Sequence, residues 1–393
     1  MQSPDKTSII EKEAIAQLER INQKTFLAKC KNVAKKIMKR AAEPKDMIFW
    51  PAGMLMLGLT EAGQIEQEAE SAKSGMEDEL KAADSTKPDT KDGLKAADST
   101  KPDTEDGLKA VEKYHDKWKS KQKGKVRYVD DALAGYSLLR MYETFGDSKY
   151  LDSANRIYSF LKNTSKNSED SIIYNVSGKD DFILADGAGM TALFLSYYGY
   201  IMRSLGVEDE SKKAFNLASL QLINYKNNGI DNRSGLPYHG YSLTKGKLGI
   251  LGWGRAVGWI MMGLAGCVSY LPVDSDQRKQ LIEWSEEIVK TVVSYQRDDG
   301  SWAWDLPCME GHVDASATGM IGWSIKKLTP FMPRLTNELK SSNDKTDKAL
   351  LPLTESSGKV LDSLSACEDL AVHRQVYGVN AWGQGAALAC LKA

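Results

Sequence analysis

The sequence predicts an all-α fold, an (α/α)6 barrel in which six inner helices are ringed by six outer ones. Three observations predict it. Six apolar segments share one pattern, charged amphipathic helices separate them, and no stretch keeps the period-two alternation of a half-buried strand. We expect this barrel to be a single catalytic domain that covers residues 1–393.

The six apolar segments each begin with Trp or Asp, and a glycine follows three or five positions later. An apolar helical run comes next, with small residues on every side, so each helix is expected to be buried on every side. The leading residues are Trp50, Asp130, Asp186, Trp253, Asp314 and Trp382.

The segments between them form amphipathic helices, for example over residues 149–162, 208–225 and 275–295. In the third, Leu281, Trp284 and Ile288 fall on one stripe at helical spacing. Inner and outer helices therefore alternate along the chain. An open helical solenoid is the rival architecture, but a count of six favours a closed ring.

Near-balanced charge limits the classes of function. The chain has 393 residues, with 52 Lys and Arg against 53 Asp and Glu, so its net charge is -1. Such a chain has no bulk electrostatic attraction to nucleic acid or to an anionic membrane. We therefore expect neither partner, and oligomeric state cannot be read from the sequence.

A 14-residue tandem repeat interrupts the pattern. Residues 80–93 (LKAADSTKPDTKDG) and 94–107 (LKAADSTKPDTEDG) differ at one position. Each copy carries one leucine among polar, Pro and Gly residues, so it cannot bury much apolar area. We interpret about residues 73–106 as an insertion that forms a solvated loop or short frayed helices.

The sequence also favours a cytoplasmic location. The N-terminus lacks the pattern of a secretory signal, and the most apolar stretch, residues 47–59, is shorter than the ~20 residues that span a bilayer. The five cysteines are widely spaced without a CxxC pair, which argues against a disulfide framework and a zinc site. Free buried thiols are typical of a cytoplasmic protein.

The six leading residues are expected to share one rim, because each begins an inner helix. Carboxylates and aromatic rings in one basin are typical of a sugar site. An Asp at a helix start is also a good N-cap, and this reading is favoured for Asp314, which precedes Ala-Ser-Ala.

Seven motifs occur in an order and spacing that resemble the unsaturated uronyl hydrolases of glycoside hydrolase families 105 and 88, of the rhamnogalacturonyl type in particular. They are VDDALAG (129–135), ADGAGM (185–190), LPYHGY (236–241), WGRAVGW (253–259), DGSWAW (299–304), DASATGM (314–320) and WGQG (382–385). The resemblance runs from about Trp50 to the end of the chain, apart from the insertion. It implies an (α/α)6 barrel that acts on oligosaccharides freed by polysaccharide lyases.

The resemblance also implies the chemistry. Family members hydrate the C4=C5 double bond of a terminal unsaturated uronic acid, and the resulting hemiketal collapses and releases the sugar. Carried over by motif, Asp186 is the general acid and base, and Asp130 is the second carboxylate.

The remaining site residues carried over bind substrate. Arg255 is expected to pair with the uronate carboxylate through its guanidinium fork. The resemblance also implies that His239, Trp253 and Trp259 bind substrate. Asp314, Trp50 and Trp382 are expected to bind substrate because of their places on the shared rim. No cofactor and no metal ion are expected.

Three positions leave alternatives open. Val257 replaces the Asn of the family motif, and Asn175 stands where a His often precedes the acid. Asp131 lies beside Asp130, so the second carboxylate could be either residue; the five-residue distance to Gly135 favours Asp130. A conventional inverting glycosidase, a sugar epimerase on the same toroid and a non-catalytic oligosaccharide binder remain alternatives.

Three further histidines and two further tryptophans are candidates for the site or for the structure around it. His115 lies in a charged stretch and is expected to be a solvated surface residue, while His312 and His373 are rim candidates. Trp302 and Trp304 are interpreted equally well as core aromatics or as a wall of the sugar cleft.

Overall fold

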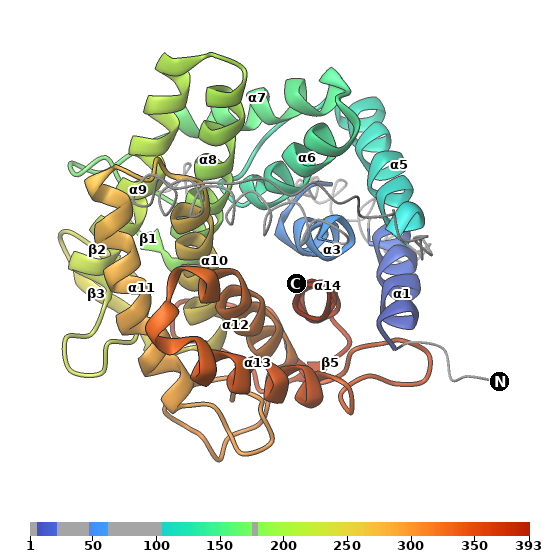
Figure 1. Cartoon of the computed structure of the whole chain (residues 1–393), viewed down its shortest axis with the longest axis vertical. Coiled ribbons are helices and arrows are strands. Elements are labelled where there is room, and N and C mark those ends of the chain that lie inside the picture. Colours follow the sequence, from blue (N-terminus) through green and yellow to red (C-terminus); the bar gives the residue numbers. More distant parts are fainter. Residues whose placement is uncertain (1–5, 22–46, 62–103, 175–179) are drawn as a thin grey trace, which may run out of the picture.

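The computed structural model describes residues 6–21, 47–61, 104–174 and 180–393. Within them, two concentric rings of helices form the predicted barrel (Figure 1). Each inner helix packs against the next, and the last one packs back against the first, so the ring is closed. The inner helices are α3 (Trp50–Thr60), α6 (Asp131–Phe145), α8 (Ala185–Ser204), α10 (Gly254–Tyr270), α12 (Ala315–Leu328) and α14 (Ala381–Lys392).

Outer helices alternate with the inner ones along the chain, as predicted. They are α1 (Lys6–Arg20), α5 (Thr104–Gln122), α7 (Ser148–Asn163), α9 (Glu208–Gly229), α11 (Asp276–Ser294) and α13 (Thr336–Leu350). The predicted stripe of α11 is buried at Leu281, Trp284 and Ile288. Two short 3-10 helices, η1 (Thr329–Phe331) and η2 (Pro333–Leu335), join α12 to α13.

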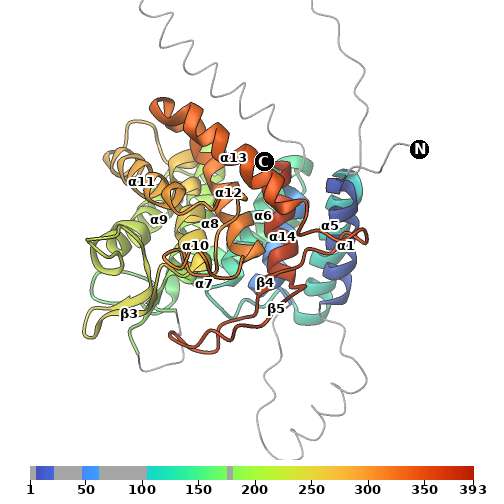
Figure 2. The same ribbon diagram turned by 90° about the horizontal axis from the view of Figure 1, so that it is seen from below.

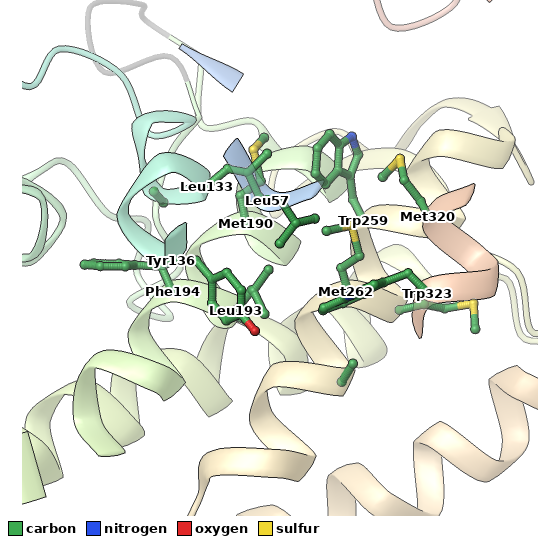
Figure 3. Packing of buried hydrophobic residues seen from close by; sticks show 14 of the residues in the cluster. Leu57, Leu133, Tyr136, Met190, Leu193, Phe194, Trp259, Met262, Met320 and Trp323 are labelled. Atoms are coloured by element: carbon green, nitrogen blue, oxygen red, sulfur yellow. The ribbon is translucent and has the colours of Figure 1, made fainter. Parts of the chain in front are cut away.

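The glycines of the repeated pattern let inner helices meet backbone to backbone. A Cβ atom at Gly189 of α8 would collide with the carbonyl group of Trp259 in α10, and one at Gly385 of α14 would collide with the carbonyl of Met54 in α3. Around these contacts, large apolar side chains fill the core between the inner helices, among them Met190, Trp259 and Met320 (Figure 3).

Strands are few and short. β1 (Ile183–Leu184), β2 (Tyr238–Ser242) and β3 (Gly246–Leu251) form an antiparallel sheet in that order, and β4 (Ser363–Leu364) pairs with β5 (Tyr377–Gly378). β3, β5 and the long hairpin before β5 lie toward one edge of the helical ring in Figure 2. β1 leads directly into α8, and β2 beside it carries His239, so this sheet sets the position of His239 relative to Asp186.

The predicted insertion at 73–106 falls almost entirely outside the described residues. Only residues 104–106 are described, and they form the first turn of α5, a helix of 19 residues, instead of a loop or a short frayed helix.

His115 is not the solvated surface residue that the sequence predicts. Its side chain is 1% exposed, and its Nε2 lies 2.8 Å from the hydroxyl of Ser153. The ring of Tyr150 packs against it with centroids 5.1 Å apart. The cause is helix packing: this face of α5 lies against α7, although its neighbours in sequence are charged. Burial lowers the pKa of His115.

None of the described helices is long and apolar enough to cross a membrane.

Candidate active site

The six leading residues lie where the inner helices begin, as predicted. Asp130, Trp253 and Asp314 are N-cap residues, Trp50 starts its helix, and Asp186 and Trp382 are second in theirs.

Ring contacts show that helix ends from different parts of the chain meet at one rim. The centroids of Trp50 and Trp382 are 4.9 Å apart, although the residues are in α3 and α14. The guanidinium carbon of Arg255 lies 4.7 Å from the ring centroid of Trp253 and 5.7 Å from that of Trp382. The beginnings of α3, α10 and α14 therefore converge.

Two carboxyl groups, those of Asp130 and Asp186, lie at the starts of α6 and α8. Asp130 is 2% exposed, whereas the side chain of Asp186 is 16% exposed. The hydroxyl of Tyr174 donates a 2.7 Å hydrogen bond to Oδ2 of Asp130, and Oδ1 is buried without a hydrogen-bond partner among the described residues. Asp186 is thus the carboxylate with surface to offer a ligand.

Burial raises the pKa of Asp130 from 3.8 to about 8. The hydrogen bond from Tyr174 lowers this pKa, and the negative charge of Asp186 raises it. Asp130 therefore keeps its proton at neutral pH.

This raised pKa has a consequence for stability. The unfolded chain loses the Asp130 proton near pH 4 while the folded chain keeps it to about pH 8, so this group destabilises the fold progressively as pH rises through that window. We expect Asp130→Asn to remove the effect. The difference between the Tm of Asp130→Asn and the Tm of the wild type, measured by thermal unfolding, should increase from pH 4 to pH 8. A difference that stays constant over this range would contradict the assignment.

Asp131 has a structural task, which supports the choice of Asp130 as the second carboxylate. Its side chain is 0% exposed, and its Oδ2 accepts hydrogen bonds from the backbone N–H groups of Arg127 and Tyr128 at 2.9 and 3.2 Å. Asp131 therefore fixes the turn that leads into α6.

Two histidines lie on the side of the rim near Asp186. Nε2 of His239 is 3.3 Å from Oδ2 of Asp186, a close polar contact without hydrogen-bond alignment, and Nδ1 is 3.2 Å from the carbonyl oxygen of Leu370. His373, a predicted rim candidate, comes from the β4–β5 hairpin, and its ring centroid lies 5.6 Å from that of His239. The hairpin therefore reaches across the ring to the Asp186 side.

His373 is uncharged at neutral pH. Burial, together with the influence of His239 and Arg255, lowers the pKa of His373 to about 4. Both ring nitrogens are buried without a hydrogen-bond partner among the described residues. A neutral imidazole in this state can donate to or accept from a bound polar ligand.

Arg255 reaches the rim, but its guanidinium fork is occupied. Nη1 donates to the carbonyl of Leu364 and Nη2 to that of Ser365, both at 2.8 Å, and Nη1 lies 3.5 Å from Oδ2 of Asp314. The side chain is 1% exposed. The structure therefore does not support the prediction that this fork binds a uronate carboxylate, and Arg255 instead anchors the β4–β5 hairpin.

Asp314 is an N-cap, the alternative that the sequence favoured. Its Oδ1 accepts hydrogen bonds from the backbone N–H groups of Ser316 at 2.9 Å and Leu364 at 3.2 Å. Its side chain is 0% exposed, so in this structure Asp314 caps α12 and presents no open surface; that it binds substrate stays a prediction.

The predicted tryptophans divide into two groups. Trp253 and Trp259 are 1% exposed and offer no face to a sugar; Trp259 belongs to the core (Figure 3). The two side chains are buried because α8 packs on Trp259 and because His239 and His373 pack on Trp253. Trp50 and Trp382 keep partly exposed rings at the rim. We therefore expect only these two to stack on a ligand.

The motif around Trp302 and Trp304 divides in the same way. Trp302 is 0% exposed, and its indole N–H donates to the carbonyl of Val292, so it is a core residue. Trp304 is partly buried with its centroid 6.1 Å from that of His373, which places it in the wall of the site. His312, the other rim candidate, is 48% exposed and stacks on Tyr377 with centroids 3.8 Å apart.

Sequence reasoning missed Tyr174 and the backbone carbonyl of Leu370. Tyr174 precedes Asn175, a position the sequence marks only as a departure from the family, and no spacing rule points to the tyrosine itself. In the described part of the chain, no three His, Cys, Asp or Glu side chains are grouped so that they could hold a metal ion.

The chain is similar to known glycoside hydrolases. Unsaturated rhamnogalacturonyl hydrolase YesR of Bacillus subtilis (strain 168) is 21% identical over 278 residues, which cover 67% of this chain and 76% of that protein.

Two solved structures share the fold. A family 105 glycoside hydrolase of C. acetobutylicum ATCC 824 has a TM-score of 0.64 and 18% identity, over 92% of this chain and 97% of that chain. An unsaturated glucuronyl hydrolase of Bacillus sp. GL1 has a TM-score of 0.58 and 13% identity, over 74% and 80%. The sequence profile of Glycosyl Hydrolase Family 88 matches residues 29–392. Because this match spans most of its length, the chain belongs to Glycosyl Hydrolase Family 88 and is a hydrolase of glycosidic bonds.

Proposed function

We propose that this hydrolase hydrates the C4=C5 double bond of a terminal unsaturated uronic acid in lyase-generated oligosaccharides and so releases the sugar. One observation supports the proposal: Tyr174 donates to Asp130 at the start of α6 and packs on Gly187, the neighbour of Asp186, at the start of α8. The Asp130 carboxyl group is buried with a raised pKa, and that of Asp186 is partly exposed. The names of the relatives, rhamnogalacturonyl and glucuronyl hydrolases, support the same reaction class.

In this proposal Asp186 delivers a proton to C4 and then assists water in its attack on C5. Its partly exposed side chain can reach a ligand, and His239 holds it from the β2 side. Asp130 stays protonated at neutral pH, because its pKa is raised to about 8, mainly by burial. Asp130 is the second carboxylate, which meets the substrate through Oδ1.

The substrate is an oligosaccharide with an unsaturated uronide at its end. Trp50 and Trp382 supply partly exposed aromatic faces, and His373 supplies unpartnered ring nitrogens. We infer a cytoplasmic enzyme with one catalytic domain. The compartment is supported by four free cysteines among the described residues, Cys267, Cys308, Cys367 and Cys390.

Ultraviolet absorbance of the double bond tests the reaction. Purified protein is mixed with unsaturated disaccharides made by a lyase, with glucuronyl and galacturonyl types in separate reactions, and products are separated in parallel. We expect absorbance to fall as sugar is released. Released sugar with unchanged absorbance would instead identify a conventional glycosidase. If such an enzyme inverts the anomeric configuration, its two carboxylates must lie about 6.5–9.5 Å apart. Unchanged absorbance without products for both substrates would contradict the proposal and favour a binder.

A further inference from the structure

We propose that Tyr174 is a positioning residue for this reaction: its hydroxyl holds Oδ2 of Asp130 and so leaves Oδ1 as the oxygen that meets the substrate. The inference rests on the proposed function, because it assigns Tyr174 to the same carboxylate pair. It adds a residue that the family motifs in this sequence do not contain.

The contact between Tyr174 and Asp130 is short and enclosed. The phenol oxygen lies 2.7 Å from Oδ2, and Asp130 is 2% exposed. Oδ1 of the same carboxyl is buried and has no hydrogen-bond partner among the described residues. A buried polar atom without a partner is costly, so Oδ1 would gain from a hydrogen bond with a bound group.

Local structure holds the ring of Tyr174 in place. Its backbone N–H donates to the carbonyl of Phe182 at 3.0 Å, just before β1. Its ring lies over the first turn of α8, where a Cβ atom at residue 187 would stand 2.9 Å from Cδ2 of Tyr174. Gly187, the neighbour of Asp186, therefore makes room for the ring, and one tyrosine links the starts of α6 and α8.

The hydrogen bond also adjusts the acidity of Asp130. A phenol donor stabilises the ionised carboxylate, so it lowers the pKa of Asp130 against the effect of burial. The pKa of Tyr174 itself is raised by burial and by the charges of Asp130 and Asp186, so the phenol remains a donor over the working range of pH. Cys367 of the β4–β5 hairpin is the other titratable group near both carboxylates, and its pKa is raised to about 12, mainly by burial.

The test is the pH dependence of kcat for Tyr174→Phe on the unsaturated disaccharide. In the wild type, the part of the kcat profile that follows the protonation of Asp130 is expected near pH 8. Loss of the phenol donor should raise the pKa of Asp130 and so shift this limb of the profile upward by about one pH unit. We expect kcat at pH 7 to fall about 10-fold, because Asp130 loses its fixed orientation, with KM changed less than about threefold.

Tyr158→Phe is a matched control. It also removes a hydrogen bond from a tyrosine to a carboxylate, at 2.8 Å from Oε2 of Glu210, but between the outer helices α7 and α9. Its pH profile should superimpose on that of the wild type. Replacement of Tyr174 by 3-fluorotyrosine keeps the ring and hydroxyl but makes a stronger donor. It should move the limb downward, and it preserves the test if Tyr174→Phe folds poorly.

If kcat of Tyr174→Phe changes at the same pH as kcat of the wild type, the proposal is overturned, even if kcat itself falls. The tyrosine would then contribute only by the packing of its ring. Failure of the proposed function is a separate outcome, in which wild-type protein leaves the absorbance unchanged. In that case the titration of Asp130 can be followed by carbon-13 NMR of labelled carboxyl groups in the wild type and in Tyr174→Phe. A difference between the two proteins still decides whether Tyr174 sets the pKa of Asp130.

Discussion

Asp186→Asn should lower kcat for hydration of the double bond by about 10²–10⁴-fold, the contribution of a positioned acid–base group. The amide has the shape of the carboxyl group, but it can neither deliver a proton to C4 nor take one from water. The side chain of Asp186 is partly exposed, and its polar contact is with Nε2 of His239. The fold should therefore be unaffected. KM should change by less than about threefold.

Initial rates by ultraviolet absorbance, with a circular dichroism spectrum of each variant, check this prediction. Asp180→Asn is a suitable control, because it makes the same change in the loop before β1 at a side chain that is 53% exposed and paired with Lys245. It should retain activity within about twofold. Near-normal turnover by Asp186→Asn would remove this residue from the role of acid and base.

Asp314→Ala should lower the free energy of unfolding by about 3–5 kcal/mol, the usual effect of removing one partner of a buried ion pair. The change leaves the guanidinium of Arg255 buried without its counter-charge. It also leaves the backbone N–H groups of Ser316 and Leu364 without their acceptor. Both the start of α12 and the β4–β5 hairpin are weakened.

Urea unfolding followed by circular dichroism measures this loss. Asp314→Asn keeps an oxygen that can cap α12, so its loss should be clearly smaller than that of Asp314→Ala. A loss below about 1 kcal/mol for the alanine variant would show that Asp314 does not hold the hairpin through Arg255.

The barrel could be predicted from the sequence because its inner helices approach closely. Close approach requires glycine at fixed positions, as Gly189 against Trp259 and Gly385 against Met54 show, and it requires apolar residues on all sides. These demands act on each helix separately, so they leave a pattern that recurs along the chain. The common rim at the helix starts follows from the same pattern.

The identity of the exposed side chains at the rim could not be predicted in the same way. The motif containing Arg255 and Trp253 predicts that both residues lie near the site, and both lie at the rim. Their availability depends on the β4–β5 hairpin, more than a hundred residues later, whose carbonyl groups occupy the guanidinium of Arg255 and whose His373 packs on Trp253. No local pattern records such a contact.

Ring closure constrains how the chain acquires this structure during synthesis on the ribosome. α14 packs between α12 and α3 and also touches α1, so helices from opposite ends of the sequence lie side by side (Figure 1). Until residues 381–392 have left the exit tunnel, α3 and α12 expose the apolar faces that α14 covers. The nascent barrel must therefore remain open at this seam through most of translation, and chaperones that bind apolar surface have their longest opportunity there.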